Sequence, residues 1–95
     1  MDEPEQAPPW RPEMGPPPER WVWPPKDPPA LWVRIDGRWC NATVLARDVY
    51  ADGRVAYRVV VSLRAPYAGT TERMYWWPQE GLRVAHRGSG RPERA

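Results

Sequence analysis

Hydrophobic and polar residues alternate with a period of two from residue 31 onward, which is the pattern of β-strands that bury one face. Residues 31–35, LWVRI, place three aliphatic side chains on one face and the side chains of Trp32 and Arg34 on the other. The dipeptide Asp36-Gly37 follows and indicates a two-residue hairpin turn, because glycine accepts the positive φ angle that this turn requires. The pattern therefore predicts a hairpin whose second strand covers residues 38–47.

Three further strands are predicted at residues 55–63, 72–77 and 82–85. A loop at residues 64–71 separates the first two of them, and a tight turn at residues 78–81, expected to form one turn of 3₁₀ helix, precedes the last. The inner face of the 38–47 strand stays open, because a β-bulge would exchange its two faces partway along.

The first thirty residues and the last nine break this pattern. Eleven of the 14 prolines lie in residues 1–30, and proline can neither propagate a helix nor donate a hydrogen bond to a sheet. We therefore expect residues 1–30 to be a disordered Pro-rich tail, whose three tryptophans dock either on the chain's own domain or on another protein. Residues 87–95 are rich in Gly, Arg and Pro and are also expected to be disordered.

These boundaries leave residues 31–86 as the folded domain. Five short strands joined by tight turns predict an all-β fold, and a small closed barrel is the expected architecture, because closure removes exposed strand edges. An open sheet is the alternative. A domain of this size is too small for a nucleotide-binding α/β fold, a kinase or a hydrolase, so its size favours a binding role.

Two stretches of the domain resemble a known family. Residues 36–45, DGRWCNATVL, resemble the first hairpin of Tudor-type domains, and residues 53–61 and 77–83 resemble the later strands and closing turn of the same barrel. The resemblance implies a five-stranded Src homology 3-like (Tudor-like) barrel. Tudor domains read methylated Lys or Arg in an aromatic cage. Because Cys40 stands where these hairpins commonly place a cage aromatic, we carry over the fold and not the methyl-reading activity.

The net charge of +2 conceals an asymmetry between tail and domain. Residues 1–30 hold six acidic and three basic residues, a net charge of −3, whereas residues 31–87 hold nine arginines and five acidic residues, a net charge of +4. An acidic tail beside a basic domain favours intramolecular contact, or competition with an anionic ligand. The alternative is a solvated tail that keeps a Trp-rich protein in solution.

Aromatic residues form the first candidate binding site. Adjacent Trp76 and Trp77 must point to opposite faces of their strand. One can fill the core, and the other is exposed unless the tail or a partner covers it. An aromatic groove would bind an extended or Pro-rich peptide, including the chain's own N-terminal tail; the alternative is that these side chains only enlarge a small core. Trp39 is expected to be structural, packed beside the first hairpin. The residues expected to form the groove are Trp32, Tyr57, Tyr75 and Trp77.

Arginines form the second candidate site. Interleaved arginine and aromatic side chains would bind nucleic acid through phosphate contacts and base stacking. The alternative is a solvated charged face, because a net charge of +4 is small for a nucleic-acid-binding domain. The residues expected to be exposed on this face are Arg34, Arg58, Arg73 and Arg83.

No set of residues indicates catalysis, a metal ion or another cofactor. Cys40 and His86 are the single cysteine and the single histidine, too few for a metal site and without a third partner for nucleophilic catalysis. One cysteine fits a reduced compartment, and neither a signal peptide nor a bilayer-spanning apolar run is visible, so we expect a cytoplasmic protein with no membrane partner. The sequence favours a non-enzymatic adaptor that binds a protein segment, with nucleic-acid binding as the alternative, and it leaves the oligomeric state open.

Overall fold

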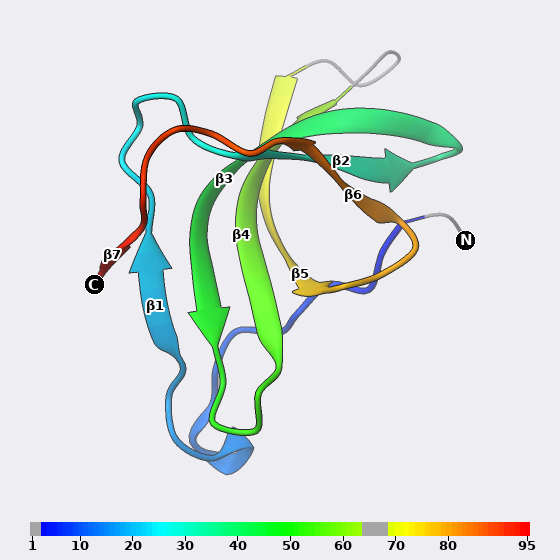
Figure 1. Cartoon of the computed structure of the whole chain (residues 1–95). Coiled ribbons are helices and arrows are strands. Elements are labelled where there is room, and N and C mark those ends of the chain that lie inside the picture. The colour runs from blue at the N-terminus through cyan, green and yellow to red at the C-terminus, as the bar shows by residue number, and fades with distance from the viewer. Residues whose placement is uncertain (1–2, 64–68) are drawn as a thin grey trace.

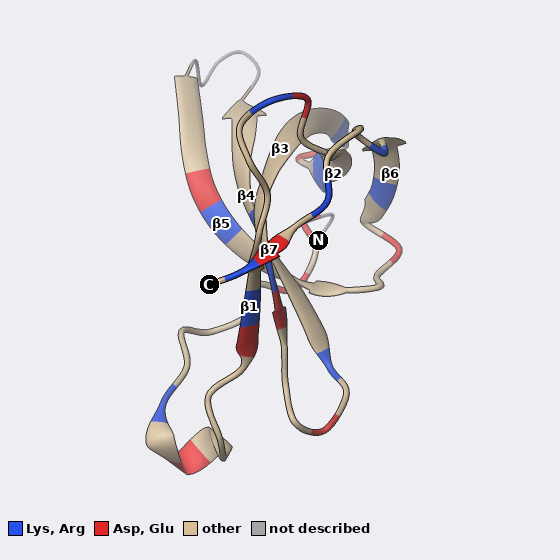
Figure 2. Ribbon diagram, turned by 60° about the vertical axis from the view of Figure 1, so that its left-hand side comes forward, with Lys and Arg blue, Asp and Glu red and all other residues tan. Residues whose placement is uncertain are grey.

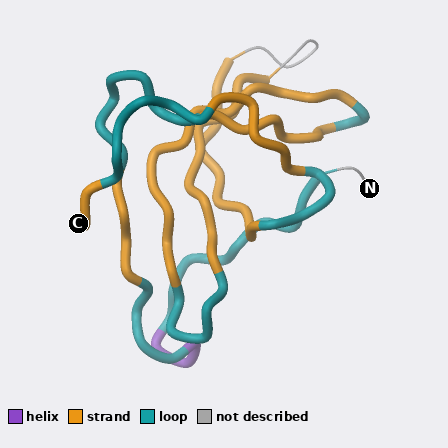
Figure 3. Tube along the Cα trace, viewed as in Figure 1, coloured by secondary structure: helices purple, strands orange, loops and turns teal. Residues whose placement is uncertain are grey.

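The computed structural model describes residues 3–63 and 69–95, and these residues form an all-β fold, as the sequence predicts (Figure 1 and Figure 3). One turn of 3₁₀ helix, η1 (Pro12–Met14), precedes the first strand. The strands are β1 (Glu19–Val22), β2 (Ala30–Ile35), β3 (Arg38–Val49), β4 (Val55–Leu63), β5 (Gly69–Trp77), β6 (Leu82–His86) and β7 (Glu93–Arg94).

β3 is the centre of a single antiparallel sheet. β4 lies along one edge of β3 and pairs in turn with β5. The other edge of β3 is shared: its first half pairs with β2, with Leu31 opposite Ala42, and its second half pairs with β1, with Trp21 opposite Arg47. β6 pairs with β2, and β7 pairs with β1. The twelve-residue length of β3 lets one strand serve both neighbours on the same edge.

The five strands predicted from the alternation are confirmed. Four of them begin and end within two residues of the predicted limits, and β5 begins three residues earlier than predicted. The last three residues of the loop expected at 64–71 therefore belong to β5, and the rest of that loop lies outside the described residues. The turn at 78–81 is present, with the Leu82 N–H donating to the Gln79 carbonyl over 3.1 Å, but it is not a 3₁₀ helix.

The sheet is not the closed five-stranded barrel that the sequence predicts. Within the described residues, β6 pairs with β2 alone, and no ladder joins it to β5. The free edge of β5 is covered by residues 5–7 instead, which make backbone hydrogen bonds to Met74 and Trp76. A strand edge that is covered by another part of the chain is protected without closure of the sheet.

Residues 3–30 also differ from the disordered tail that the sequence predicts. β1 falls within residues 19–23, the longest stretch without proline in the first thirty residues. Such a stretch keeps all of its backbone donors and can pair, whereas the prolines on either side cannot donate. Beyond β1, the Trp23 N–H donates to the Leu45 carbonyl over 3.0 Å, and the Pro29 carbonyl accepts from the Val44 N–H over 2.9 Å. The C-terminal segment, also expected to be disordered, pairs with β1 as β7.

A β-bulge in β3 divides the hydrophobic residues into two clusters. The register of β3 against β4 shifts between Val44 and Ala46. Every second residue of β3 faces the main core before the shift, and the same alternation continued past the shift faces the outer side of the sheet. Tyr50, beyond the bulge, packs with Ala56 and Ala7 in an outer cluster. The bulge therefore exchanges the two faces of β3, which answers the question that the sequence left open. The main core consists of Leu31, Val33, Cys40, Ala42, Val44, Val59, Val61, Tyr75 and Leu82.

Candidate functional site

The N-terminal arm, residues 3–7, lies along the free edge of β5 (Figure 1). Gln6 forms an antiparallel bridge with Tyr75, and the Ala7 N–H donates to the Met74 carbonyl over 2.9 Å. The Trp76 N–H donates in return to the Glu5 carbonyl over 3.4 Å. These contacts use backbone groups only, so the arm extends the sheet as a bound peptide does at a sheet edge.

The side chain of Gln79 holds the backbone of Glu5 from the turn between β5 and β6. Its Oε1 accepts from the Glu5 N–H over 2.7 Å, and its Nε2 donates to the Glu5 carbonyl over 2.8 Å. The same Nε2 donates to the Trp76 carbonyl over 2.7 Å, which ties the amide to β5. The Gln79 amide thus binds Glu5 with one donor and one acceptor, as the backbone of a neighbouring strand would.

The Glu3 carboxylate anchors the start of the arm. Its Oε2 accepts a hydrogen bond from Arg73 Nη1 at 2.6 Å and another from the Tyr75 hydroxyl at 2.9 Å. The Tyr75 side chain is fully buried, and this burial raises the pKa of Tyr75 to about 12, although Arg73 acts in the opposite direction. The phenol therefore stays protonated at neutral pH and remains a donor to a carboxylate. Arg73 and Tyr75 together form a carboxylate socket on β5.

The arm also covers apolar surface on the outer face of the sheet. Ala7 is buried and packs with Tyr50 and Ala56. The rings of Tyr50 and Trp76 lie 5.3 Å apart between centroids, and the Arg54 guanidinium sits 4.5 Å from the centroid of Trp76. The arm is therefore held by backbone, carboxylate and apolar contacts together.

The second contact between the Pro-rich segment and the sheet is aromatic. Trp23 lies 6.3 Å from Tyr57, and Tyr57 meets Trp77 edge-on at 5.6 Å, both measured between ring centroids. These three residues form the aromatic mouth, which borders a mainly apolar pocket of about 190 Å³. Val84 lines the same pocket and is 50% exposed, so the mouth is open to solvent beside β6.

The four residues predicted for the peptide groove do not form one surface. Tyr57 and Trp77 lie together in the aromatic mouth. Tyr75 belongs to the same hydrophobic cluster but is fully buried, with only its hydroxyl reaching the arm. Trp32 is half-buried and belongs to neither hydrophobic cluster of the described residues.

Sequence reasoning missed Trp23 as a member of the aromatic mouth. The tryptophans of the Pro-rich segment predicted docking either on the chain's own domain or on another protein, and the place of docking has no signal in the sequence. Trp76 and Trp77 take opposite faces of β5, as alternation predicts. Each is half-buried: Trp76 packs against the outer cluster, and Trp77 packs against the main core.

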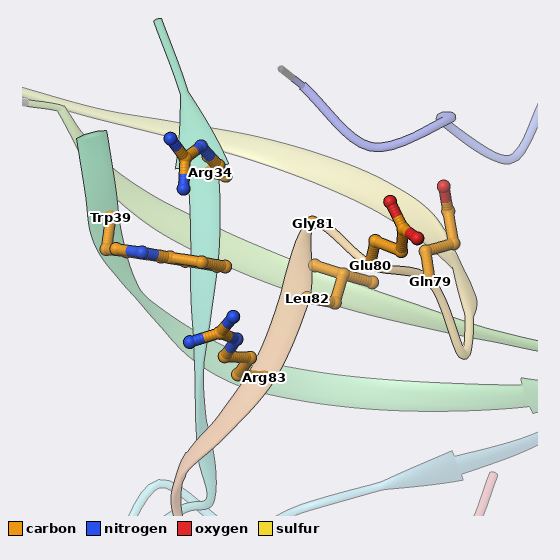
Figure 4. Close-up of a pocket in the computed structure, with 7 residues that line it drawn as sticks. All are labelled: Arg34, Trp39, Gln79, Glu80, Gly81, Leu82 and Arg83. Carbon is orange, nitrogen blue, oxygen red and sulfur yellow. The ribbon is translucent and has the colours of Figure 1, made fainter. Parts of the chain in front are cut away.

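A polar pocket, the Trp39 pocket, lies beside the first hairpin (Figure 4). The Arg34 guanidinium lies 5.4 Å from the centroid of the Trp39 ring, and the Arg83 guanidinium lies 4.5 Å from it. Figure 4 shows these two guanidiniums on opposite faces of the indole. The pocket has a volume of about 680 Å³, and its remaining lining comes from Gln79, Glu80, Gly81 and Leu82.

The four arginines predicted for a nucleic-acid face are divided among three places. Arg34 and Arg83 share the Trp39 pocket. Arg58 pairs with Glu72 at 3.7 Å, and Arg73 lies in the carboxylate socket, on the same side of β5 as the buried Tyr75. Figure 2 shows basic and acidic residues interspersed along the strands rather than gathered into one basic band.

The described residues show no metal site: none of them belongs to a group of three or more His, Cys, Asp and Glu side chains that could hold an ion. Cys40 is buried in the main core, and His86 contacts Asp27 at 2.7 Å. No helix in residues 3–63 or 69–95 has the length and apolar character needed to cross a membrane. No protein-family model, no curated protein and no solved structure matches this chain.

Proposed function

We propose that this protein is a non-enzymatic interaction module that binds extended, proline-containing protein segments, and that its own N-terminal arm is an internal ligand. The observation that carries the proposal is the arm, Glu-Pro-Glu-Gln-Ala, bound to the edge of β5. Backbone pairing supplies affinity at such an edge, and a side-chain site supplies selectivity. The carboxylate socket is that side-chain site, because it binds Glu3 through two donors.

The proposal includes a fold assignment for residues 30–86, as an open barrel of the Src homology 3-like, Tudor-like type. Its support is the meander of β2, β3, β4 and β5, followed by a tight turn and by a last strand, β6, that pairs with β2. A barrel that stays open between β5 and β6 leaves an edge for a peptide to occupy.

The aromatic mouth serves in this proposal as a second docking point, occupied by Trp23. Trp23 is followed directly by two prolines, and a Pro-rich segment is already extended before it binds, so it loses little conformational freedom. Tyr57 contacts Trp23, and Trp77 packs edge-on against Tyr57 in the same mouth. A partner segment with an aromatic residue beside prolines would compete with Trp23 for this place.

Two observations weigh against the alternative of a nucleic-acid-binding module. Arg58 and Arg73 are engaged with Glu72 and Glu3, so they are not free to contact phosphates. Guanidiniums occupy both faces of Trp39, so no base could stack on that ring without displacing one of them.

Binding in trans tests the proposal. A chain that lacks residues 1–7 is titrated calorimetrically with a synthetic peptide of residues 1–9, MDEPEQAPP, after circular dichroism shows that the shortened chain is folded. We expect saturable binding with one peptide per chain and no binding to the full chain, whose arm occupies the edge. Glu3→Gln in the peptide and Arg73→Gln in the chain should each weaken binding by about tenfold, because each removes a charge-assisted hydrogen bond.

The matched control for Arg73→Gln is Arg91→Gln, which removes the same charge from an exposed residue. It should leave the affinity for the peptide nearly unchanged. A folded, shortened chain that does not bind the wild-type peptide would show that the arm is only a structural part of the domain.

A further inference from the structure

We propose that the Trp39 pocket binds the carboxylate side chains of an acidic protein segment. This site is separate from the carboxylate socket on β5, and the inference does not rest on the proposed function. Its cationic groups are Arg34 and Arg83, which come from β2 and β6 and meet at Trp39 from β3.

Arg34 and Arg83 differ in their partners from five other arginines, although Arg47 also lies against a ring, that of Trp23. Arg20, Arg54, Arg58, Arg73 and Arg94 each form an ion pair with a carboxylate. Arg34 and Arg83 have only the ring of Trp39 as a side-chain partner among the described residues. Their N–H donors are therefore available, and a guanidinium fork matches the geometry of a carboxylate.

The strands hold these side chains in place before any ligand binds. Arg34 and Trp39 are directly opposite each other in the β2–β3 ladder, and Trp32 pairs with Arg83 in the β2–β6 ladder. The Arg34 N–H donates to the carbonyl of Gly81 over 3.0 Å, and this bond holds β2 beside a residue that lines the pocket. Stacking on the indole restricts both guanidiniums, so less side-chain freedom is lost on binding an anion.

The rest of the lining favours a peptide over a nucleic acid. Glu80 lines the same pocket, and the phosphate backbone of DNA has no hydrogen-bond donor for this carboxylate, whereas a peptide backbone has one at each N–H group. The Glu80 carboxylate can therefore accept hydrogen bonds from the backbone of a bound peptide segment. A segment in which acidic side chains alternate with exposed amides meets both requirements.

The test uses the full chain labelled with ¹⁵N and a hexaglutamate peptide with blocked ends as the probe. The affinity is measured from the shift of the indole N–H signal of Trp39 during titration at low salt. The test variant carries Arg34→Gln and Arg83→Gln. The matched control carries Lys26→Gln and Arg91→Gln, which removes the same charge from two exposed residues outside the pocket.

We expect the test variant to lose at least about tenfold in affinity for hexaglutamate, and the control to lose less than about twofold, because exposed charges at a distance contribute little. Arg83→Lys, which keeps the charge but loses the planar fork, should fall between the wild-type chain and the test variant. This single change also provides a result if the double variant does not fold.

Three results would overturn the inference. Equal weakening by the test and control variants would mean that only the net charge of the protein attracts the peptide. Weakening by Arg73→Gln but not by the test variant would place the peptide in the carboxylate socket of β5 instead. Tighter binding of a single-stranded oligothymidylate than of hexaglutamate, with sensitivity to Arg34 and Arg83, would identify a nucleic-acid site.

Discussion

Arg20 of β1 and Asp48 of β3 are opposite each other in the sheet and form a two-point ion pair, with Nε to Oδ1 and Nη2 to Oδ2 both at 2.8 Å. The Asp48 side chain is 2% exposed, whereas that of Arg20 is 38% exposed. The charged carboxylate is therefore buried, and the guanidinium of Arg20 balances its negative charge. This pair fastens the Pro-rich N-terminal segment to the sheet.

Replacing Arg20 by Ala should lower the free energy of unfolding by about 2–3 kcal/mol, because it leaves the buried Asp48 carboxylate without its partner. Urea denaturation followed by tryptophan fluorescence measures the change. The control is Arg94→Ala, which removes a guanidinium that lies 3.6 Å from Glu19 in an exposed pair. The control should change stability by less than about 0.5 kcal/mol. Similar losses in the two variants would mean that the Arg20–Asp48 pair has no special role.

Replacing Gln79 by Ala should release the arm from β5 while leaving the sheet folded, because Gln79 makes two hydrogen bonds to Glu5 and one to Trp76. Hydrogen exchange at the Ala7 amide, which donates to Met74, reports the release. We expect this amide to exchange about tenfold faster in the variant, which corresponds to the loss of roughly one net hydrogen bond.

Gln79→Glu is the more stringent version of this experiment. It keeps the acceptor for the Glu5 N–H but replaces the Nε2 donor by an oxygen, which faces the carbonyls of Glu5 and Trp76. The Ala7 amide should exchange at least as fast as in Gln79→Ala. Protection equal to that of the wild-type chain would show that the arm is held without Gln79.

The contact between Asp27 and His86 should make stability depend on pH at the acid end. A hydrogen bond from His86, with a smaller contribution from Ser89, lowers the pKa of Asp27 below its ordinary value of 3.8. A carboxyl group whose pKa is lower in the folded chain stabilises the fold above its unfolded pKa, and this contribution disappears as the pH falls through its folded pKa. Asp27→Asn should therefore lower the Tm at about pH 6 but leave it unchanged at about pH 2.

Thermal unfolding of the two chains across this range measures the effect. A change of His86 to Gln should reproduce the loss at the higher pH, since it removes the other half of the same contact. A Tm difference between Asp27→Asn and the wild-type chain that stays constant down to the acid end would contradict the assignment to an ionised Asp27.

Gly88 should tolerate alanine less well than Gly53 does. Its φ angle is +73°, and a Cβ atom there would lie 2.7 Å from the Asp27 carbonyl oxygen and 2.8 Å from the Pro29 nitrogen. Gly53 has a φ angle of +92° but nothing within 4 Å of its Cβ position, so it provides the matched control for backbone strain alone. We expect Gly53→Ala to destabilise the fold by about 1 kcal/mol and Gly88→Ala by clearly more, as measured by urea denaturation. Equal losses would mean that the C-terminal segment shifts away from Pro29 at little cost in free energy.

The five central strands and most of their faces were predictable because they depend on local patterns. Alternation places Val33 and Val59 in the main core, and Asp36-Gly37 sets the first hairpin. The bulge between Val44 and Ala46 was recognised only as an open alternative, because alternation along one strand does not reveal the register of its neighbour. Of the predicted groove, Tyr57 and Trp77 lie together at the surface, whereas Tyr75, opposite Tyr57 in the sheet, is fully buried and Trp32 lies outside the main core; alternation gives a shared face but not the depth of burial.

The sequence by itself determined an all-β domain with five central strands, a turn before the last of them, and an acidic Pro-rich segment with few backbone donors. Only the tertiary structure decided that this segment is ordered and that it pairs along the edge of β5 in a sheet that does not close. The physical reason is that the contacts of Glu3, Trp23 and Arg20 join residues far apart in the chain. Their partners are brought within reach by strand pairing, which no local pattern in the Pro-rich segment encodes.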